Sequence, residues 1–184
     1  MKERSQKESG PFRVLFVCSG NTCRSPMAEG ILKNLLPAEY KDKISVTSAG
    51  TLGLWEMPAS DLAVAVAAEH NIDLSGHRSR GLTRSLLETC DLVLCMAREH
   101  EEFIRYRFPT FREQTYLLKG FDRSKKRRRN SDIEDPIGKS REVYEKVFDE
   151  IRLEIERILP RLLRLADQKA ELAQAEGPGG GARE

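Results

Sequence analysis

The chain has 184 residues, a length that suits a single domain. Hydrophobic residues make up 39% and charged residues 33%, which provides for a packed core and excludes a disordered or collagen-like chain. The 31 Lys and Arg residues against 29 Asp and Glu residues leave a formal charge of +2, so the chain as a whole has no strong attraction for nucleic acid or an anionic membrane.

The N-terminal sequence and the cysteines favour a cytoplasmic protein. The first ten residues lack the apolar segment of a secretory signal, and no apolar run approaches the ~18 residues needed to span a bilayer. The four cysteines form two pairs close in sequence, Cys18 with Cys23 and Cys90 with Cys95. Without an export signal, reduced thiols are a better interpretation than disulfides, and one of them could be reactive.

Short β-prone runs alternate with helical patterns along the chain. Ser25 suits the N-cap of the first helix and Pro26 its first position, while Pro160 should kink or split the last one. In chain order we expect a strand at 12–17, a helix at 26–36, a strand at 44–47, a helix from 61 to about 70, a strand at 92–96, a short helix from 98, a strand at 115–118 and a long helix from 140. This alternation predicts an α/β fold with a parallel sheet covered on both faces.

The composition also suggests where the domain ends. Residues 1–11 are polar and predict a flexible arm, residues 12–166 the folded domain, and residues 167–184 a polar, Gly-rich tail. The basic run 125–129 (KKRRR) is interpreted either as solvated surface or as a patch that steers anionic partners toward a nearby site.

The loop between the first strand and the first helix carries the chemistry. Its amides and the start of the helix can hold a phosphate-sized dianion, and Arg24 can place two donors on the same anion. Cys18 lies in the same positive field, which favours its thiolate form, and Gly20 lets the loop turn. A cysteine with an arginine six positions later can occur by chance, but here it stands between a strand and a helix start. The pattern therefore predicts an activated sulfur aimed at a bound phosphorus.

This loop and its flanks resemble the low-molecular-weight protein tyrosine phosphatase family. The matching segments are 17–29 (VCSGNTCRSPMAE), 48–51 (SAGT), His77 with Arg80, 91–96 (DLVLCM) and 135–136 (DP), within a resemblance over roughly residues 12 to 165. It implies a three-layer α/β/α fold around a central four-stranded parallel sheet, with the phosphate-binding loop between strand 1 and helix 1. It also implies two-step phosphatase chemistry without a cofactor.

The resemblance implies a role for each matching residue. Cys18 would attack phosphorus, Arg24 would stabilise the equatorial charge with the loop amides, and Asp135 would protonate the leaving atom and later activate water. The residues expected to form the phosphate-binding loop are Ser19, Gly20, Asn21, Thr22, Cys23 and Ser25, with Ser48 and His77 in support. Ser25 would hydrogen-bond the cysteine sulfur, and Asn21, Ser48 and His77 would hold the loop in shape.

Three of these residues have a second interpretation. Asp135 with its following proline could form only a turn, and His77 could be a surface histidine. Cys23 could form a protective disulfide with the nucleophile on oxidation, as in the family, or could be a small buried hydrophobic residue.

The substrate is predicted from two departures from the tyrosine-specific members. Those enzymes typically carry an aliphatic residue at the place of Thr22 and tyrosines after the Asp-Pro, where this chain has Ile137 and Gly138. With Glu142-Val143-Tyr144, the pattern resembles the protein arginine phosphatase branch, in which the threonine is associated with phosphoarginine preference; Ile137 departs from the aromatic usual in that branch. A threonine hydroxyl can bond a guanidinium or orient water. We expect phosphoarginine on proteins, with phosphotyrosine as the alternative, and Trp55 either at the pocket mouth or packed in the domain.

Two other classes of function remain open. A thioredoxin-linked arsenate reductase would need two further redox cysteines. Cys90 and Cys95 are candidates, but residues 91–96 are predicted to form a buried strand that would keep thiols inert. A non-catalytic phosphate-binding module is the other alternative, but no catalytic residue is missing to suggest it, since Cys18, Arg24 and Asp135 are all present. The three histidines have no metal-site spacing, so we expect no metal, no nucleic-acid partner and no membrane, and the oligomeric state is left open.

Overall fold

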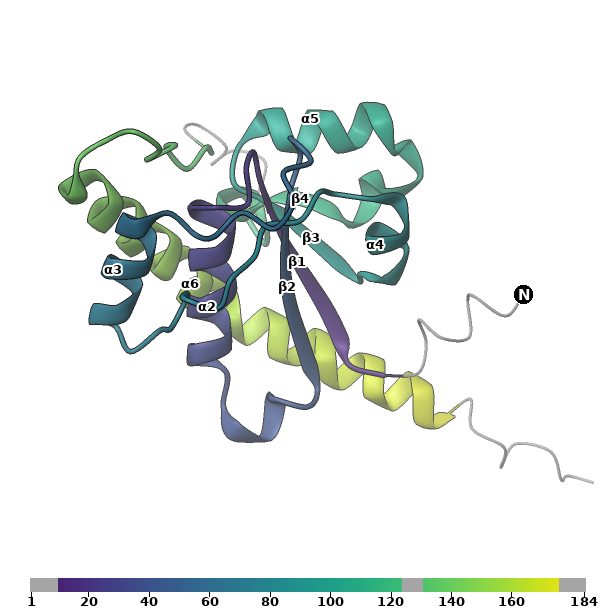
Figure 1. Ribbon diagram of the computed structural model, residues 1–184. Coiled ribbons are helices and arrows are strands. Elements are labelled where there is room, and N and C mark those ends of the chain that lie inside the picture. The colour runs from purple at the N-terminus through teal and green to yellow at the C-terminus, as the bar shows by residue number, and fades with distance from the viewer. Residues whose placement is uncertain (1–9, 124–130, 176–184) are drawn as a thin grey trace, which may run out of the picture.

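Four parallel strands form one sheet at the centre of the molecule, in the order β2-β1-β3-β4 (Figure 1). The computed structural model describes residues 10–123 and 131–175. The strands are β1 (Phe12–Cys18), β2 (Ile44–Gly50), β3 (Leu92–Cys95) and β4 (Thr115–Leu117). The four strands expected from the sequence are confirmed, as is the parallel sheet, and β2 continues to Gly50.

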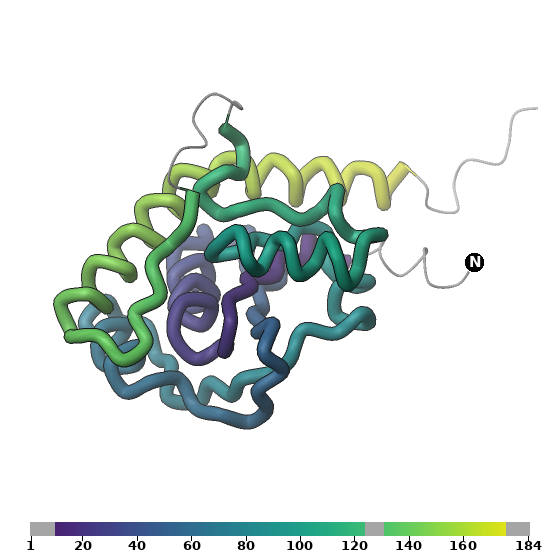
Figure 2. Tube along the Cα trace, turned by 90° about the horizontal axis from the view of Figure 1, so that it is seen from above, coloured from purple at the N-terminus to yellow at the C-terminus, as the bar shows by residue number. Residues whose placement is uncertain are grey.

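Helices cover both faces of this sheet, which confirms the three-layer arrangement (Figures 1 and 2). Helices α2, α3 and α6 pack on one face, and α4 and α5 pack on the other. The helices are α2 (Arg24–Leu35), α3 (Asp61–Glu69), α4 (Arg84–Thr89), α5 (Arg98–Arg107) and α6 (Arg141–Ala175), with 3-10 turns η1 (Ala38–Tyr40), η2 (Pro109–Gln114) and η3 (Leu118–Gly120). Among the α-helices of the described residues, α4 is the one without a counterpart among the elements expected from the sequence.

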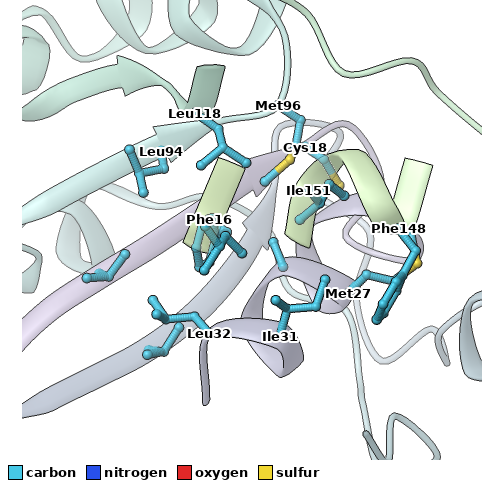
Figure 3. Close-up of a cluster of buried hydrophobic side chains, with 14 of the residues drawn as sticks. Phe16, Cys18, Met27, Ile31, Leu32, Leu94, Met96, Leu118, Phe148 and Ile151 are labelled. Atoms are coloured by element: carbon cyan, nitrogen blue, oxygen red, sulfur yellow. The ribbon is translucent and has the colours of Figure 1, made fainter. Parts of the chain in front are cut away.

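The alternation of side chains along β1 divides the core into two layers. Val14 and Phe16 point toward α2, α3 and α6, whereas Leu15 and Val17 point toward α4 and α5. Figure 3 shows the first layer, in which Phe16 lies among side chains of α2, β3 and α6. Because β1 is apolar on both faces, it occupies the middle of the sheet. Its last residue, Cys18, lies at the edge of the sheet where the strands end.

The start of α2 differs from the sequence prediction. Ser25 is not the N-cap: the helix begins at Arg24, with Cys23 in the N-cap position and no side-chain cap. The hydroxyl of Ser25 is instead 3.0 Å from Cys18 Sγ. The N-cap prediction was wrong because the Ser25 hydroxyl is used by contacts within the loop, to Cys18 Sγ and the Asn21 side chain.

Helix α6 also differs from the prediction, because it runs unbroken through Pro160 to Ala175. Ile155, Ile158, Leu162 and Ala166 are buried on either side of the proline, and this continuous packing outweighs the lost backbone hydrogen bond. The expected boundary at residue 166 falls inside this helix.

The residues just beyond that boundary make tertiary contacts. Asp167 accepts a hydrogen bond from the Tyr40 hydroxyl at 2.7 Å, and Lys169 Nζ pairs with Asp91 at 2.7 Å. Residues 167–175 therefore belong to the folded unit. The basic run 125–129, most of the N-terminal arm and residues 176–184 lie outside the described residues, and within the described ones no helix is long and apolar enough to cross a membrane.

Candidate active site

The predicted phosphate-binding loop connects the carboxyl end of β1 to the start of α2, and Cys18 lies at its beginning. The thiol is buried, and Sγ accepts a hydrogen bond from the backbone N–H of Asn21 at 3.2 Å. Ser25 Oγ lies 3.0 Å from the same sulfur. Ser25 Oγ accepts a bond from the Asn21 side chain, so its own proton is available for the sulfur. Both contacts place a hydrogen-bond donor on the sulfur.

Asn21 ties the loop to two other segments. Its backbone has a φ of +56°, in the left-handed region that Asn tolerates better than most residues. Nδ2 donates to Ser25 Oγ and Ser48 Oγ, both at 2.9 Å, and Oδ1 accepts the backbone N–H of Arg80 at 2.9 Å. Because the backbone carbonyl of Asn21 can only accept, His77 Nε2 donates to it at 2.8 Å. The structure thus brings together the residues that the sequence analysis assigned to loop support.

A second loop follows β2 and braces the first. The backbone N–H groups of Thr51 and Leu52 donate to the carbonyls of Cys18 and Ser19, both at 3.0 Å. Gly50 permits this approach, since a Cβ there would lie 2.6 Å from the Ser19 carbonyl oxygen. Ser48, which accepts a hydrogen bond from the Asn21 side chain, itself donates to Glu29 Oε2 at 2.6 Å. The SAGT segment therefore fixes the backbone whose amides would face a phosphate.

Arg24 is a buried cation aimed at the same loop. Its side chain is 3% exposed, with Nη1 donating to the Ile133 carbonyl at 3.1 Å and Nη2 to Ser19 Oγ at 3.1 Å. Nη2 also forms an ion pair with the carboxylate of Asp135, which is 40% exposed. The second oxygen of Asp135 accepts the Ile137 N–H at 3.1 Å, so the carboxylate caps a turn and reaches the cation as well. The predicted acid and the predicted arginine are therefore adjacent.

The sequence analysis missed one residue of this cluster, His100 on α5. Its side chain is 1% exposed, and its Nε2 lies 2.9 Å from Ser19 Oγ. Burial lowers the pKa of this imidazole from 6.5 to about 4, with a further contribution from the Arg24 guanidinium. One signal could have found it: α5 follows β3, whose carboxyl end lies at the same edge of the sheet as that of β1.

The second thiol of the loop, Cys23, contacts a small polar cluster. Cys23 is buried, and its Sγ lies 3.3 Å from both Ser60 Oγ and the Tyr144 hydroxyl. Burial, with a contribution from the Cys23 contact, raises the pKa of Tyr144 to about 12. Cys23 is thus a buried and hydrogen-bonded side chain within the loop, and its protective disulfide with Cys18 stays a prediction.

The remaining residues singled out in the sequence divide into exposed and buried ones. Trp55 and Ile137 are 70% and 58% exposed, which excludes core packing for Trp55. Thr22 is half-buried, with Oγ1 3.7 Å from Cys23 Sγ. Cys90 and Cys95 are buried and not joined in a disulfide, and burial raises the pKa of Cys95 well above its usual value. Their burial argues against redox exchange at this pair of cysteines. Among the described residues, no cluster of His, Cys, Asp and Glu side chains suits a metal ion.

The sequence matches known proteins over most of its length. Residues 13–171 match the family described as low molecular weight phosphotyrosine protein phosphatase. The chain is 38% identical to a protein-arginine-phosphatase of Geobacillus stearothermophilus over 83% of its own length and 97% of that protein. It is 36% identical to a protein-arginine-phosphatase of Bacillus subtilis strain 168 over 75% and 88% of the two chains. The structure of a low-molecular-weight protein tyrosine phosphatase from T. tengcongensis superposes with a TM-score of 0.73 at 38% identity, covering 82% of this chain and 99% of that one.

Proposed function

Because the chain belongs to the low-molecular-weight phosphotyrosine protein phosphatase family, we propose that it hydrolyses phosphoarginine on proteins through a phosphocysteine intermediate. The observation that carries the chemistry is the buried loop in which Cys18 Sγ accepts from Asn21 N–H while Arg24 pairs with Asp135. The arginine preference is supported by Thr22 within that loop and by the curated protein-arginine-phosphatases at 38% and 36% identity. The substrates would be phosphorylated cytoplasmic proteins.

In the first step Cys18 attacks phosphorus and the bond from phosphorus to the leaving nitrogen breaks. The loop amides and Arg24 receive the charge of the equatorial oxygens; in support, Asn21 N–H already donates to Cys18 Sγ and Arg24 Nη2 to Ser19 Oγ. Asp135 in its acid form gives its proton to the leaving guanidino nitrogen. Asp135 is partly exposed, whereas Arg24 is 3% exposed. The Asp135 side chain can therefore leave its contact with Arg24 and turn to the leaving group.

In the second step a water molecule attacks the phosphocysteine. Asp135, now a carboxylate, accepts a proton from this water, and the sulfur–phosphorus bond breaks to release phosphate and the Cys18 thiolate. Ser25 assists the second step, because its hydroxyl stabilises the negative charge that returns to the sulfur 3.0 Å away as the sulfur–phosphorus bond breaks. This scheme gives Cys18, Arg24 and Asp135 the catalytic roles and Ser25 a supporting one.

Thr22 carries the choice of substrate. A hydroxyl beside the reacting group can hold a guanidinium nitrogen or the attacking water, whereas an isoleucine offers a phenol ring apolar contact. A hydrogen bond to a charged group contributes roughly 1.5–3 kcal/mol, which corresponds to about ten- to a hundredfold in rate. We therefore expect Thr22→Ile to lower kcat/KM for phosphoarginine at least about tenfold while kcat/KM for phosphotyrosine holds or rises.

The experiment measures kcat/KM for phosphoarginine and phosphotyrosine peptides side by side. Thr22→Ser is the matched control, because it keeps the hydroxyl and should keep the preference, and Cys18→Ser should be inactive on both substrates. A wild-type preference for phosphotyrosine, or a ratio that Thr22→Ile does not change, would replace the arginine phosphatase proposal with tyrosine phosphatase activity. Loss of both activities together would report damage to the loop rather than to specificity, so the ratio is the decisive quantity.

A further inference from the structure

His100 is held in one tautomer by its surroundings. Its Nδ1 accepts the backbone N–H of Ala97 at 3.0 Å, in the first turn of α5. The proton of the neutral ring must therefore be on Nε2. Nε2 faces Ser19 Oγ at 2.9 Å and Glu99 Oε1 at 3.2 Å, both of which can accept.

The hydroxyl of Ser19 receives two donors, and this determines its orientation. Arg24 Nη2 donates to Oγ at 3.1 Å, and His100 Nε2 approaches the same oxygen at 2.9 Å. The two lone pairs are then occupied, and the hydroxyl proton is directed to Glu99 Oε1 at 3.3 Å. Without the imidazole, the hydroxyl could rotate and present its proton toward the guanidinium, which would repel it.

We propose that His100 is a positioning residue for the phosphatase reaction: it fixes the Ser19 hydroxyl as an acceptor for Arg24 and so sets the orientation of the guanidinium. The inference rests on the proposed role of Arg24 in receiving the phosphate. The guanidinium is anchored on one nitrogen by the Ile133 carbonyl and on the other by Ser19 and Asp135. When the Asp135 carboxylate turns to the leaving group, the Ser19 contact is the one that keeps Nη2 in place.

The imidazole can do this only while it is neutral. A second proton would go onto Nδ1, where it would break the Ala97 contact and place a cation beside the buried Arg24. The charged groups that face the ring are Arg24, which opposes protonation, and Glu99, Asp132 and Asp135, which favour it. Burial outweighs these carboxylates, so the ring stays a neutral donor throughout the neutral pH range.

Two substitutions separate this role from the capping of α5. In His100→Asn the amide oxygen can replace Nδ1 as acceptor for Ala97, but the side chain is too short to reach Ser19. In His100→Gln the amide nitrogen can replace Nε2 as donor to Ser19, while the Ala97 contact is lost. We expect His100→Asn to lower kcat by about tenfold with a smaller change in KM, because Arg24 is needed most in the transition state. We expect His100→Gln to restore kcat to within about threefold of wild type.

The assay uses an activated aryl phosphate with the full chain, so it does not depend on the choice between phosphoarginine and phosphotyrosine. Ser19→Ala supplies the second arm: adding His100→Asn to it should cause no further loss, because the contact is already gone. If His100→Gln loses as much activity as His100→Asn, or if His100→Asn lowers kcat equally with and without Ser19, then His100 does not act through Ser19 and the inference fails. A wild-type protein inactive on every phosphorylated substrate would instead overturn the proposed function.

Discussion

Asn21 provides the sharpest test of how the loop is held, and the substitution to make is Asn21→Ala. The change removes three side-chain hydrogen bonds: two buried ones donated to the hydroxyls of Ser25 and Ser48, and a part-buried one accepted from Arg80 N–H. It also places an alanine at a φ of +56°. Stability and loop geometry should therefore be lost together.

The magnitude follows from these contacts. The two hydroxyls can rotate to other partners, so their bonds contribute roughly 0.5–1.5 kcal/mol each, whereas the Arg80 N–H left without an acceptor costs about 1–3 kcal/mol. At a φ of +56° alanine is less favourable than asparagine, and because both carry a Cβ the substitution adds less than the about 1–2 kcal/mol that this backbone costs an ordinary residue. Since such terms are seldom fully additive, we expect Asn21→Ala to lower the free energy of unfolding by roughly 3–5 kcal/mol.

Asn71 offers a matched control, because it is exposed and has a φ of +58°. Asn71→Ala should cost only this backbone difference, which is less than about 1–2 kcal/mol, and the difference between the two variants isolates the side-chain hydrogen bonds of Asn21. Chemical denaturation followed by circular dichroism is the assay, since the single tryptophan, Trp55, is already 70% exposed and would report unfolding poorly. If Asn21→Ala costs no more than Asn71→Ala and still binds inorganic phosphate, the loop is not held by this side chain and the reasoning is wrong.

Three further predictions concern the acid, the second thiol and the buried histidine. Asp135→Asn should slow phosphoarginine hydrolysis more than aryl phosphate hydrolysis, because guanidine leaves with a pKa above ~12 and a phenol with ~10; equal slowing would assign Asp135 to the turn alone. Mild peroxide should form a reversible Cys18–Cys23 disulfide, seen by peptide mapping, while Cys23→Ser is inactivated irreversibly; equal irreversible loss in both would remove the protective role. The pKa of His100 is about 4 in the fold against 6.5 unfolded, so the unfolded state takes the proton first and stability is lost as pH falls below 6.5. By pH 5 this amounts to about 2 kcal/mol, which His100→Asn should abolish in parallel denaturation curves.

The sequence predicted the parts of this molecule that depend on neighbouring residues. The strand before Cys18, the loop to Arg24 and the helix after it are contiguous, so spacing alone shows that a sulfur, a turn and a helix start must meet. Ser60 is another such case, since it was expected to precede a helix and does cap α3 by accepting from Ala63 N–H. Local rules failed where another contact of the loop used the same atom, as with the Ser25 hydroxyl, or where packing outweighed a local penalty, as at Pro160.

His100 was missed for a different reason, because nothing around it in the sequence marks it as functional. Its importance arises from topology. In a parallel sheet every strand ends at the same edge, so the residues after β1, β2 and β3 converge although they are far apart along the chain. Cys18 ends β1, Gly50 ends β2 and supports the Cys18 loop, and α5 begins just after β3 and carries His100 to Ser19. Once the strands are known to be parallel, any polar residue in the first turn after a strand next to β1 is a candidate for the site. His100 is the residue in the first turn of α5 that is buried against the Cys18 loop.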